Sequence, residues 1–205
     1  PTRKGKVLLI GCGANSEVRP SFLAQFALMG SIYMQRMEGI AAPRVGLVNN
    51  GAEAEKGTEL TKAAYKLLSE MPINFVGNAE GRDLVSGDFD VIVTDGFTGN
   101  VILKFMEGLA GVLTGMLKDE LSRSWRAKLG AAIALPAFRS FRKKMDYTEY
   151  GGALMLGVNG GVIKAHGSSN AKAICSTLRQ AVGFIKADVV NVIKEEISKI
   201  SLGDD

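Results

Sequence analysis

Short apolar runs alternate along the chain with longer segments in which apolar residues return every three or four positions. Six of the runs are rich in Val, Ile and Leu, which is typical of strands that are buried on both faces of a sheet. They are Lys6 to Ile10, Arg44 to Asn49, Ile73 to Asn78, Asp90 to Gly96, Leu154 to Val158 and Gly161 to Ala165. The pattern therefore predicts six short strands.

The longer segments follow the period of an α-helix. Between residues 21 and 37, five large side chains lie three or four positions apart and so share one helical face. These side chains are Phe22, Phe26, Met29, Tyr33 and Met37. The same period predicts helices over Thr58 to Met71, over Asn100 to Leu121 and over Asn170 to Ile200, and Pro72 should end the first of these three.

Strands that alternate with helices indicate a mainly parallel sheet, because the helix that connects two parallel strands covers one face of that sheet. We therefore predict an α/β fold, a three-layer sandwich with helices on both faces of the sheet. The chain has 205 residues, of which 46% are hydrophobic, enough to bury one sizeable core. We expect a single domain over 1–205.

The residues that could hold a metal or form a disulfide lie far apart. Cys12 and Cys175 are the two cysteines, and His166 is the one histidine. This set does not supply a zinc site, and it favours reduced thiols in a cytosolic protein over a disulfide framework. No apolar run approaches the roughly 18 residues that a membrane span needs. We expect no metal, no other cofactor and no transmembrane segment.

Polar and glycine-rich residues follow four of the predicted strands. In open α/β sheets, ligands bind beyond the carboxyl ends of the strands, so these four segments are candidates for a site. They read GCGAN (11–15), GNAEGRD (77–83), TDGFTGN (94–100) and KAHGSSN (164–170). The first is not a dinucleotide-binding motif, because Ser16 stands where the third glycine would be.

Structural roles would also explain these segments. Asp95 and Asn100 could orient a ligand, but Asp-Gly is a common turn pair and Asn100 could cap a helix. Arg82 suits bidentate binding of a phosphate or a carboxylate, yet Glu80 or Asp83 could pair with it in a structural ion pair. Side-chain chemistry leaves both interpretations open.

The KAHGSSN segment carries the most chemical content of the four. Lys164 adds a positive charge, and His166 can transfer a proton near neutral pH or bond to an anion. Backbone and side-chain donors at the start of the next helix come from Gly167, Ser168, Ser169 and Asn170. Together these groups indicate a phosphate site. A helix cap and an ordinary hydrogen-bonded histidine would explain the same residues.

Several longer motifs, taken in order, resemble the bacterial phosphate acyltransferase family called PlsX. They are GAN, FALMG, RVGLVNNGAEAEKGTEL, INFVGNAEGRD, VTDGFTGNVILK and YGGALMLGVNGGVIKAHGSSNAKAI. The match covers essentially the whole chain and corresponds to the carboxyl-terminal part of a member, roughly three-fifths of it. The N-terminal strand segment of the family, with its DAMGGD-like motif, is absent, so we expect a truncated chain.

The resemblance implies a fold, a reaction and partners. Family members are similar in fold to the isocitrate and isopropylmalate dehydrogenases and form homodimers. In the implied reaction, an acyl group passes from acyl carrier protein to inorganic phosphate, and the acyl phosphate then serves phospholipid synthesis. Phosphate itself attacks the thioester, so the protein holds phosphate and stabilises the oxyanion without forming an acyl-enzyme.

Motif position and side-chain chemistry assign roles within this reaction. Catalysis is assigned to His166, Lys164 and Asn100. Substrate binding is assigned to Ser168, Ser169, Asn170, Gly167, Asp95, Asn78, Arg82 and Asn15. Two other functions stay open, namely a phosphotransacetylase-like enzyme that uses coenzyme A and a non-catalytic scaffold that docks carrier protein and membrane.

Positive charge concentrates in residues 122–144, which hold seven Lys or Arg and no Asp or Glu. This favours a local acidic partner or an anionic surface over nucleic acid. Apolar Trp125, Leu135 and Phe138 interleave with the charges, and Pro136 should break the segment into two short helices. We predict a protruding basic helical hairpin, inserted over 118–148, that contacts an anionic membrane through these three apolar side chains.

Membrane contact at this hairpin agrees with the resemblance, because family members are peripherally associated with membranes. It implies a cytoplasmic protein at the inner face of the cell membrane. Acyl carrier protein, which is acidic, is a second candidate partner for the same charges. Packing against a dimer mate, with the charges in solvent, would explain the hairpin without either partner.

Overall fold

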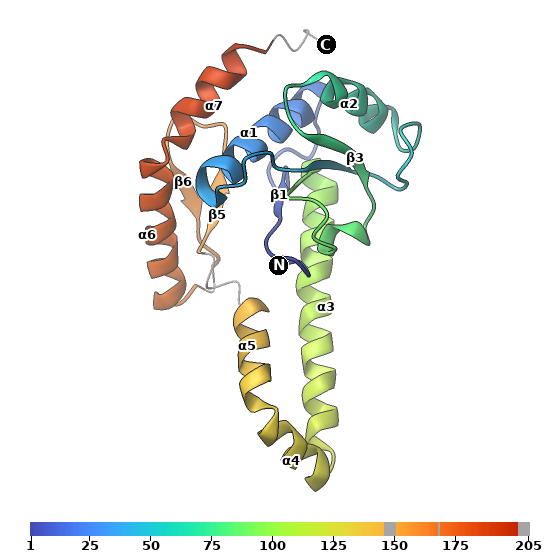
Figure 1. Cartoon of the computed structure of the whole chain (residues 1–205), viewed down its shortest axis with the longest axis vertical. Helices are drawn as coiled ribbons and strands as arrows, with labels where there is room; N and C mark the ends of the chain where they lie inside the picture. Colours follow the sequence, from blue (N-terminus) through green and yellow to red (C-terminus); the bar gives the residue numbers. More distant parts are fainter. Residues whose placement is uncertain (146–150, 168, 201–205) are drawn as a thin grey trace.

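The computed structural model of the chain describes residues 1–145, 151–167 and 169–200 (Figure 1). The main sheet has four strands in the order β1 (Leu8–Ile10), β4 (Val91–Val93), β2 (Val45–Val48) and β3 (Phe75–Ala79), and every neighbouring pair is parallel. β5 (Ala153–Met155) and β6 (Val162–Lys164) pair antiparallel in a separate sheet. The six predicted strands and the mainly parallel α/β class are therefore confirmed.

Helices lie on both faces of the main sheet. α1 (Pro20–Glu38), α2 (Glu59–Glu70) and α7 (Val189–Ser198) share the larger hydrophobic core with Val91 and Val93 of β4. Ile92, between those two valines, belongs to a second cluster on the other face with Leu84 and Ile102. This alternation follows from the period of two in a strand. The arrangement is consistent with the predicted three-layer sandwich.

Local signals set the ends of α1 and α2, and the predicted stop at Pro72 is confirmed. α1 begins with Pro20 in its first turn and ends at Gly39, which takes the left-handed conformation with φ of 72°. The Thr58 side chain accepts a hydrogen bond from the Thr61 backbone N–H and so caps α2, which ends before Pro72. These helices are positioned by residues at their own ends.

The prediction of one terminal helix over Asn170 to Ile200 is wrong. The chain forms α6 (Ala171–Lys186) and then α7, with a break at Asp188, whose φ of 54° is left-handed. The break lets both helices bury a side chain, Phe184 from α6 and Val189 from α7. The Arg36 Nε donates to the carbonyl oxygen of Ala187 at 2.9 Å, which holds the turn against α1.

Three helices connect the two sheets. α3 (Gly96–Ser122) leaves the main sheet, and α4 (Trp125–Ile133) and α5 (Leu135–Met145) turn the chain back toward β5 and β6 (Figure 1). The predicted break into two short helices is confirmed: α4 ends at Ile133, and Pro136 lies in the first turn of α5, where a missing backbone N–H costs little. The single-domain boundary and the 118–148 insertion stay predictions.

Of the described helices, α3 alone is long and apolar enough to cross a membrane, judged by length and composition. This corrects the expectation that no segment would qualify. The Lys104–Glu107 ion pair, at 2.9 Å, interrupts the apolar run without lowering its mean hydropathy below that of a span. No residue of the qualifying window is buried within the described chain. One such helix is weak support for a membrane span, and we assign none.

One carboxylate fixes the start of two central strands. The Asp90 side chain accepts from the backbone N–H of Arg44 at 2.8 Å and from its Nε and Nη2, each at 2.9 Å. The Asp90 side chain is 12% exposed. Hydrogen bonds from Arg44 lower the pKa of Asp90, although burial acts in the opposite direction. The folded state therefore favours the ionised carboxylate.

We expect Asp90→Asn to lower the free energy of unfolding by about 2 kcal/mol at neutral pH, because an amide cannot accept every one of these bonds. The pKa of Asp90 is lower in the folded state, so its contribution is full above the unfolded value of about 4 and disappears as pH falls through the folded value. Urea titrations at pH 7 and in acid should show the difference between the two proteins closing. Asp88→Asn, at an exposed site, is the control and should change little.

Candidate functional site

The loops that follow β1, β2, β3 and β4 gather at one edge of the main sheet, because the four strands are parallel. The GCGAN loop and the start of α3 are bonded to each other at this edge. Gly13 N–H donates to the Gly96 carbonyl oxygen at 3.1 Å, and Gly96 N–H donates to the Asn15 carbonyl oxygen at 2.8 Å. Asn15 and Asp95, which lie far apart in the sequence, are thus neighbours.

Glycine is required where these backbones touch. A Cβ atom on Gly11, whose φ is +102°, would lie 1.8 Å from the Thr94 carbonyl oxygen. A Cβ atom on Gly96 would lie 2.4 Å from the Asn15 carbonyl oxygen. Gly11 and Gly96 therefore allow close packing between the end of β1 with its loop and the chain that follows β4.

Two buried oxygen atoms at the same edge have no hydrogen-bond partner among the described residues. They are Oδ1 of Asn78, at the end of β3, and Oγ1 of Thr94, just after β4. The Asn78 Nδ2 donates to the Glu53 carbonyl oxygen at 2.7 Å, so this amide also holds the loop after β2. An unpaired buried polar atom costs about 1–3 kcal/mol and is uncommon. Each of these two oxygens can therefore accept a hydrogen bond from a bound ligand.

The start of α3 is already occupied by a carboxylate. Oδ1 of Asp95 accepts from the backbone N–H groups of Phe97 and Thr98 at 2.9 and 2.8 Å. Asp95 therefore caps α3, and its negative charge would repel an anion at that helix end. Asn100 lies one turn further along and is exposed to solvent. Of the two, Asn100 is the better placed to meet a phosphate.

The ion pair that the sequence left open for Arg82 is present. Its Nη2 donates to Oε2 of Glu80, and its Nε lies 3.9 Å from Oδ1 of Asp83. The Arg82 side chain is nevertheless 81% exposed. It can reorient toward a ligand, because an exposed ion pair contributes little to stability.

The loop after β2 was missed by the sequence reasoning. Asn49 Nδ2 donates to the Lys56 carbonyl oxygen at 2.9 Å, which closes the loop into a compact turn. Gly51 and Gly57 leave room inside it, because an added Cβ at either would collide with Lys56 or Asn49 side-chain atoms. Lys56 is exposed and is the one cation of this loop, which also carries the exposed carboxylates of Glu53 and Glu55. Ligands bind beyond the carboxyl ends of strands, and the same rule applied to the end of β2 would have identified this loop as a candidate.

The KAHGSSN segment lies elsewhere, on the turn between β6 and α6. Asn170 Oδ1 accepts from the Ala173 backbone N–H at 3.0 Å, so it caps α6 as one interpretation predicted. His166 and Lys164 are exposed, and the His166 carbonyl oxygen accepts from the Ser169 N–H at 3.0 Å. Ser168 lies outside the described residues. Figure 1 shows the start of α6 well separated from the start of α3.

The structure thus places the predicted site residues in two groups. Around the sheet edge lie Asn15, Asn78, Arg82, Asp95 and Asn100. On the turn between β6 and α6 lie Lys164, His166, Gly167, Ser169 and Asn170. The roles assigned to both groups stay predictions.

Comparison with known proteins identifies the family. Residues 1–192 match a family model described as "Fatty acid synthesis protein". This chain belongs to that family. Within the family, a protein of Thermoanaerobacterium thermosaccharolyticum is 50% identical over 205 residues, which is all of this chain and 61% of the relative.

Further relatives give the same picture. A protein of Alkaliphilus oremlandii is 52% identical over 205 residues and 61% of its own length, and one of Heliobacterium modesticaldum is 53% identical over 197 residues and 59% of its length. All three relatives are named phosphate acyltransferase. The chain therefore spans about three-fifths of the length of the curated relatives that it matches.

One residue at the sheet edge is unsuited to covalent catalysis. Burial raises the pKa of the Cys12 thiol, so the thiol stays protonated near neutral pH and is a weak nucleophile. The other cysteine, Cys175, is exposed on α6.

Proposed function

We propose that this chain is the larger part of a phosphate acyltransferase that transfers a fatty acyl group from acyl carrier protein to inorganic phosphate. The observation that carries the proposal is about 50% identity, over the whole chain, to relatives named phosphate acyltransferase. The matched region includes the loops at the sheet edge and the KAHGSSN turn. The product is an acyl phosphate for phospholipid synthesis.

In the proposed reaction, an oxygen atom of phosphate attacks the thioester carbonyl carbon. A C–O bond forms, the C–S bond breaks, and the carrier protein's sulfur leaves as a thiol with the proton that hydrogen phosphate gives up. The protein has to hold an anion and stabilise the negative charge that develops on the carbonyl oxygen. Exposed Lys56 and Asn100 at the sheet edge offer a cation and an amide for the first task. Lys164 and His166 offer a second cation and a proton donor.

The two groups of residues stand apart within one chain, so we propose that the active protein is a homodimer. Apolar side chains on α3 support this, because Val101, Phe105, Val112 and Met116 are each more than half exposed. A contiguous apolar face of this kind is typical of a protein interface. We also propose that the fold of the whole protein is similar to that of the isocitrate and isopropylmalate dehydrogenases.

The test is formation of acyl phosphate from palmitoyl acyl carrier protein and phosphate, trapped with hydroxylamine as the hydroxamate. It is run with the 205-residue chain and with a chimera that adds the remaining two-fifths of the Alkaliphilus oremlandii relative. We expect turnover that requires both substrates in at least the chimera. Palmitoyl coenzyme A as the better donor would favour the phosphotransacetylase-like alternative. No phosphate-dependent turnover in either protein would contradict the proposal and favour a scaffold.

We propose, second, that the helices after α3 attach a cytoplasmic protein to the inner face of the cell membrane. Trp125 and Ile133 of α4 are 70% and 75% exposed, and Leu135 at the start of α5 is 43% exposed. Phe138 is half-buried. Arg126 stacks over the Trp125 ring, 5.5 Å from its centroid. Aromatic and basic side chains side by side suit the headgroup region of an anionic bilayer.

We expect the double change Trp125→Asp and Ile133→Asp to lower sedimentation with vesicles of phosphatidylcholine and phosphatidylglycerol by about tenfold or more, because each change replaces an apolar contact by a repelled charge. The matched control is Ile185→Asp, which alters a side chain of similar exposure, 73%, on α6. Equal sedimentation of the double variant and the unchanged protein would contradict membrane binding. Acyl carrier protein or the dimer mate would then be the partner that contacts the basic residues.

A further inference from the structure

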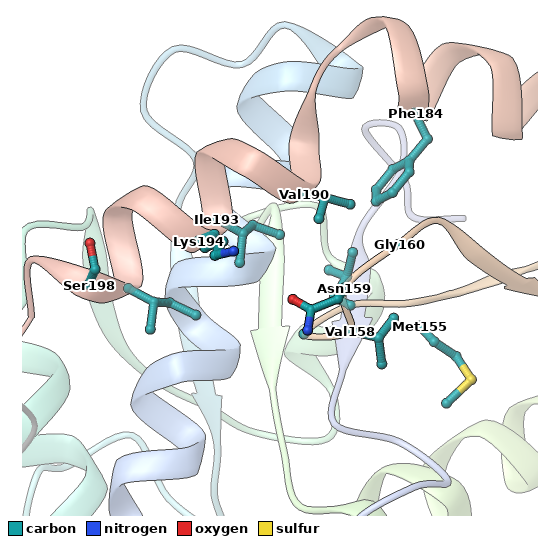
Figure 2. A pocket seen from close by; sticks show the side chains of 12 residues that line it. Met155, Val158, Asn159, Gly160, Phe184, Val190, Ile193, Lys194 and Ser198 are labelled. Atoms are coloured by element: carbon teal, nitrogen blue, oxygen red, sulfur yellow. The ribbon is translucent and has the colours of Figure 1, made fainter.

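A cavity of about 250 Å³ opens between α7 and the turn that joins β5 to β6 (Figure 2). Five residues of α7 line it at the spacing of one helical face. They are Val190, Ile193, Lys194, Ile197 and Ser198. Val158 and Asn159 of the turn face them from the other side. The cavity therefore has walls from two elements that are packed against the same core.

The floor of this cavity is apolar and the mouth is polar. Phe184 and Ile193, which are 2% and 5% exposed, belong to the hydrophobic core. At the mouth lie Lys194 and Asn159, both exposed. Of the described residues that line the cavity, none is Asp or Glu. The nearby Glu196 carboxylate on α7 accepts from Lys199 Nζ at 2.6 Å, so its charge is compensated.

We propose that this cavity binds the alkyl chain of a fatty carboxylate or fatty acyl group, with the head group at Lys194. An apolar floor favours methylene groups over water, and an ammonium group at the mouth selects an anionic or strongly polarised oxygen. The volume is below the range of about 300–1,000 Å³ that is typical for drug-sized ligands, so the cavity encloses one segment of a chain. The choice of a fatty occupant rests on the proposed function.

Binding is measured by isothermal titration calorimetry with hexanoate, octanoate and decanoate. We expect saturable binding, with affinity rising about fourfold for each methylene group that enters the cavity. Lys194→Ala should weaken decanoate about tenfold and leave decanol unchanged, because decanol lacks the charge. Lys194→Arg should retain most of the affinity. Lys186→Ala, at the end of α6 and outside the cavity, is the control.

A second variant tests the apolar wall. Val158→Asp places a carboxylate at the mouth, and Val162→Asp alters a side chain of similar exposure on β6 that does not line the cavity, 46% against 41%. Only the first should abolish decanoate binding. Circular dichroism checks that both variants fold, and Lys194→Ala keeps the test decisive if Val158→Asp does not. The proposal is overturned if decanoate does not saturate, or if neither the Lys194 nor the Val158 change weakens it.

A separate competition experiment identifies the source of the bound alkyl chain. Decanoyl acyl carrier protein that competes with free decanoate would identify the carrier-bound acyl group as an occupant, whereas absence of competition would identify the free acid. These titrations need no phosphate and no turnover. If the protein binds decanoate as expected but forms no acyl phosphate, the cavity proposal stands and the proposed reaction is contradicted.

Discussion

Replacing Lys56 with methionine is expected to lower the rate of acyl phosphate formation by about a hundredfold or more. Lys56 is an exposed cation in the loop after β2, and that loop is held to the sheet edge through Asn49 and Asn78. A positioned positive charge is worth most where negative charge develops in the reaction, and removing one such donor typically costs 10²–10³ in rate. The change should affect the reaction far more than the fold.

The measurement is hydroxamate formation at varied phosphate, using whichever of the chain or chimera is active. Loss of phosphate binding alone would raise KM for phosphate, whereas loss of transition-state stabilisation would lower kcat. Lys56→Arg should restore part of the rate, because the charge returns. The matched control is Lys62→Met on α2, where the lysine pairs with Glu59 at 3.0 Å. Both variants should unfold at the same urea concentration as the unchanged protein.

The same assay decides between the two groups of candidate residues. A Lys56→Met variant with nearly full activity, together with an inactive His166→Ala variant, would place phosphate on the turn between β6 and α6. Loss of activity in both would mean that the two groups act together, as the proposed homodimer allows. The remaining pattern, an inactive Lys56→Met and an active His166→Ala, would place phosphate at the main sheet edge.

Gly11→Ala is expected to destabilise the fold by about 3 kcal/mol or more. The new Cβ would lie 1.8 Å from the Thr94 carbonyl oxygen and 3.4 Å from the Phe26 ring, and the φ of +102° is unfavourable for alanine. A contact with backbone cannot be relieved by turning a side chain, so β1 and the start of α3 would have to move apart. Losses of stability of this size come from a few causes, and a buried clash with backbone is one of them.

Gly13→Ala provides the control for this prediction. Gly13 also has a positive φ, +79°, but no atom lies within 4 Å of an added Cβ. Its substitution should cost only the backbone strain, about 1 kcal/mol. Urea unfolding followed by circular dichroism compares the two variants. Equal losses would show that the close approach of Gly11 to Thr94 contributes nothing, and that strain in φ explains both.

Much of the fold could be predicted because its causes are local. The apolar runs mark buried strands wherever they pair, and the ends of α1 and α2 are set by Pro20, Gly39 and Thr58 within a few residues of each end. The break between α6 and α7 could not be predicted, because residues 187–188 hold no glycine or proline. There the chain turns since Phe184 and Val189 both reach the core, and only packing shows that.

Only one of the two groups of candidate site residues could be placed correctly from the sequence. The strand-end rule brought Asn15, Asn78 and Asn100 to one edge, and the structure confirms that their loops share it. It could not separate the KAHGSSN turn, because an apolar run does not reveal whether its strand joins the main sheet. β6 pairs antiparallel with β5 instead, through a short connection, and so carries the turn before α6 away from that edge (Figure 1).

The sequence by itself determined the α/β class, the six strands, the helix ends with their own stop signals, and the resemblance to the family. All of these depend on residue type, period and order along the chain. The tertiary structure decided which strand ends meet, where Gly11 must touch Thr94, which polar atoms stay unpaired, and where a cavity forms beside Lys194. These features depend on atoms from distant segments, and their distances exist only once the chain has packed.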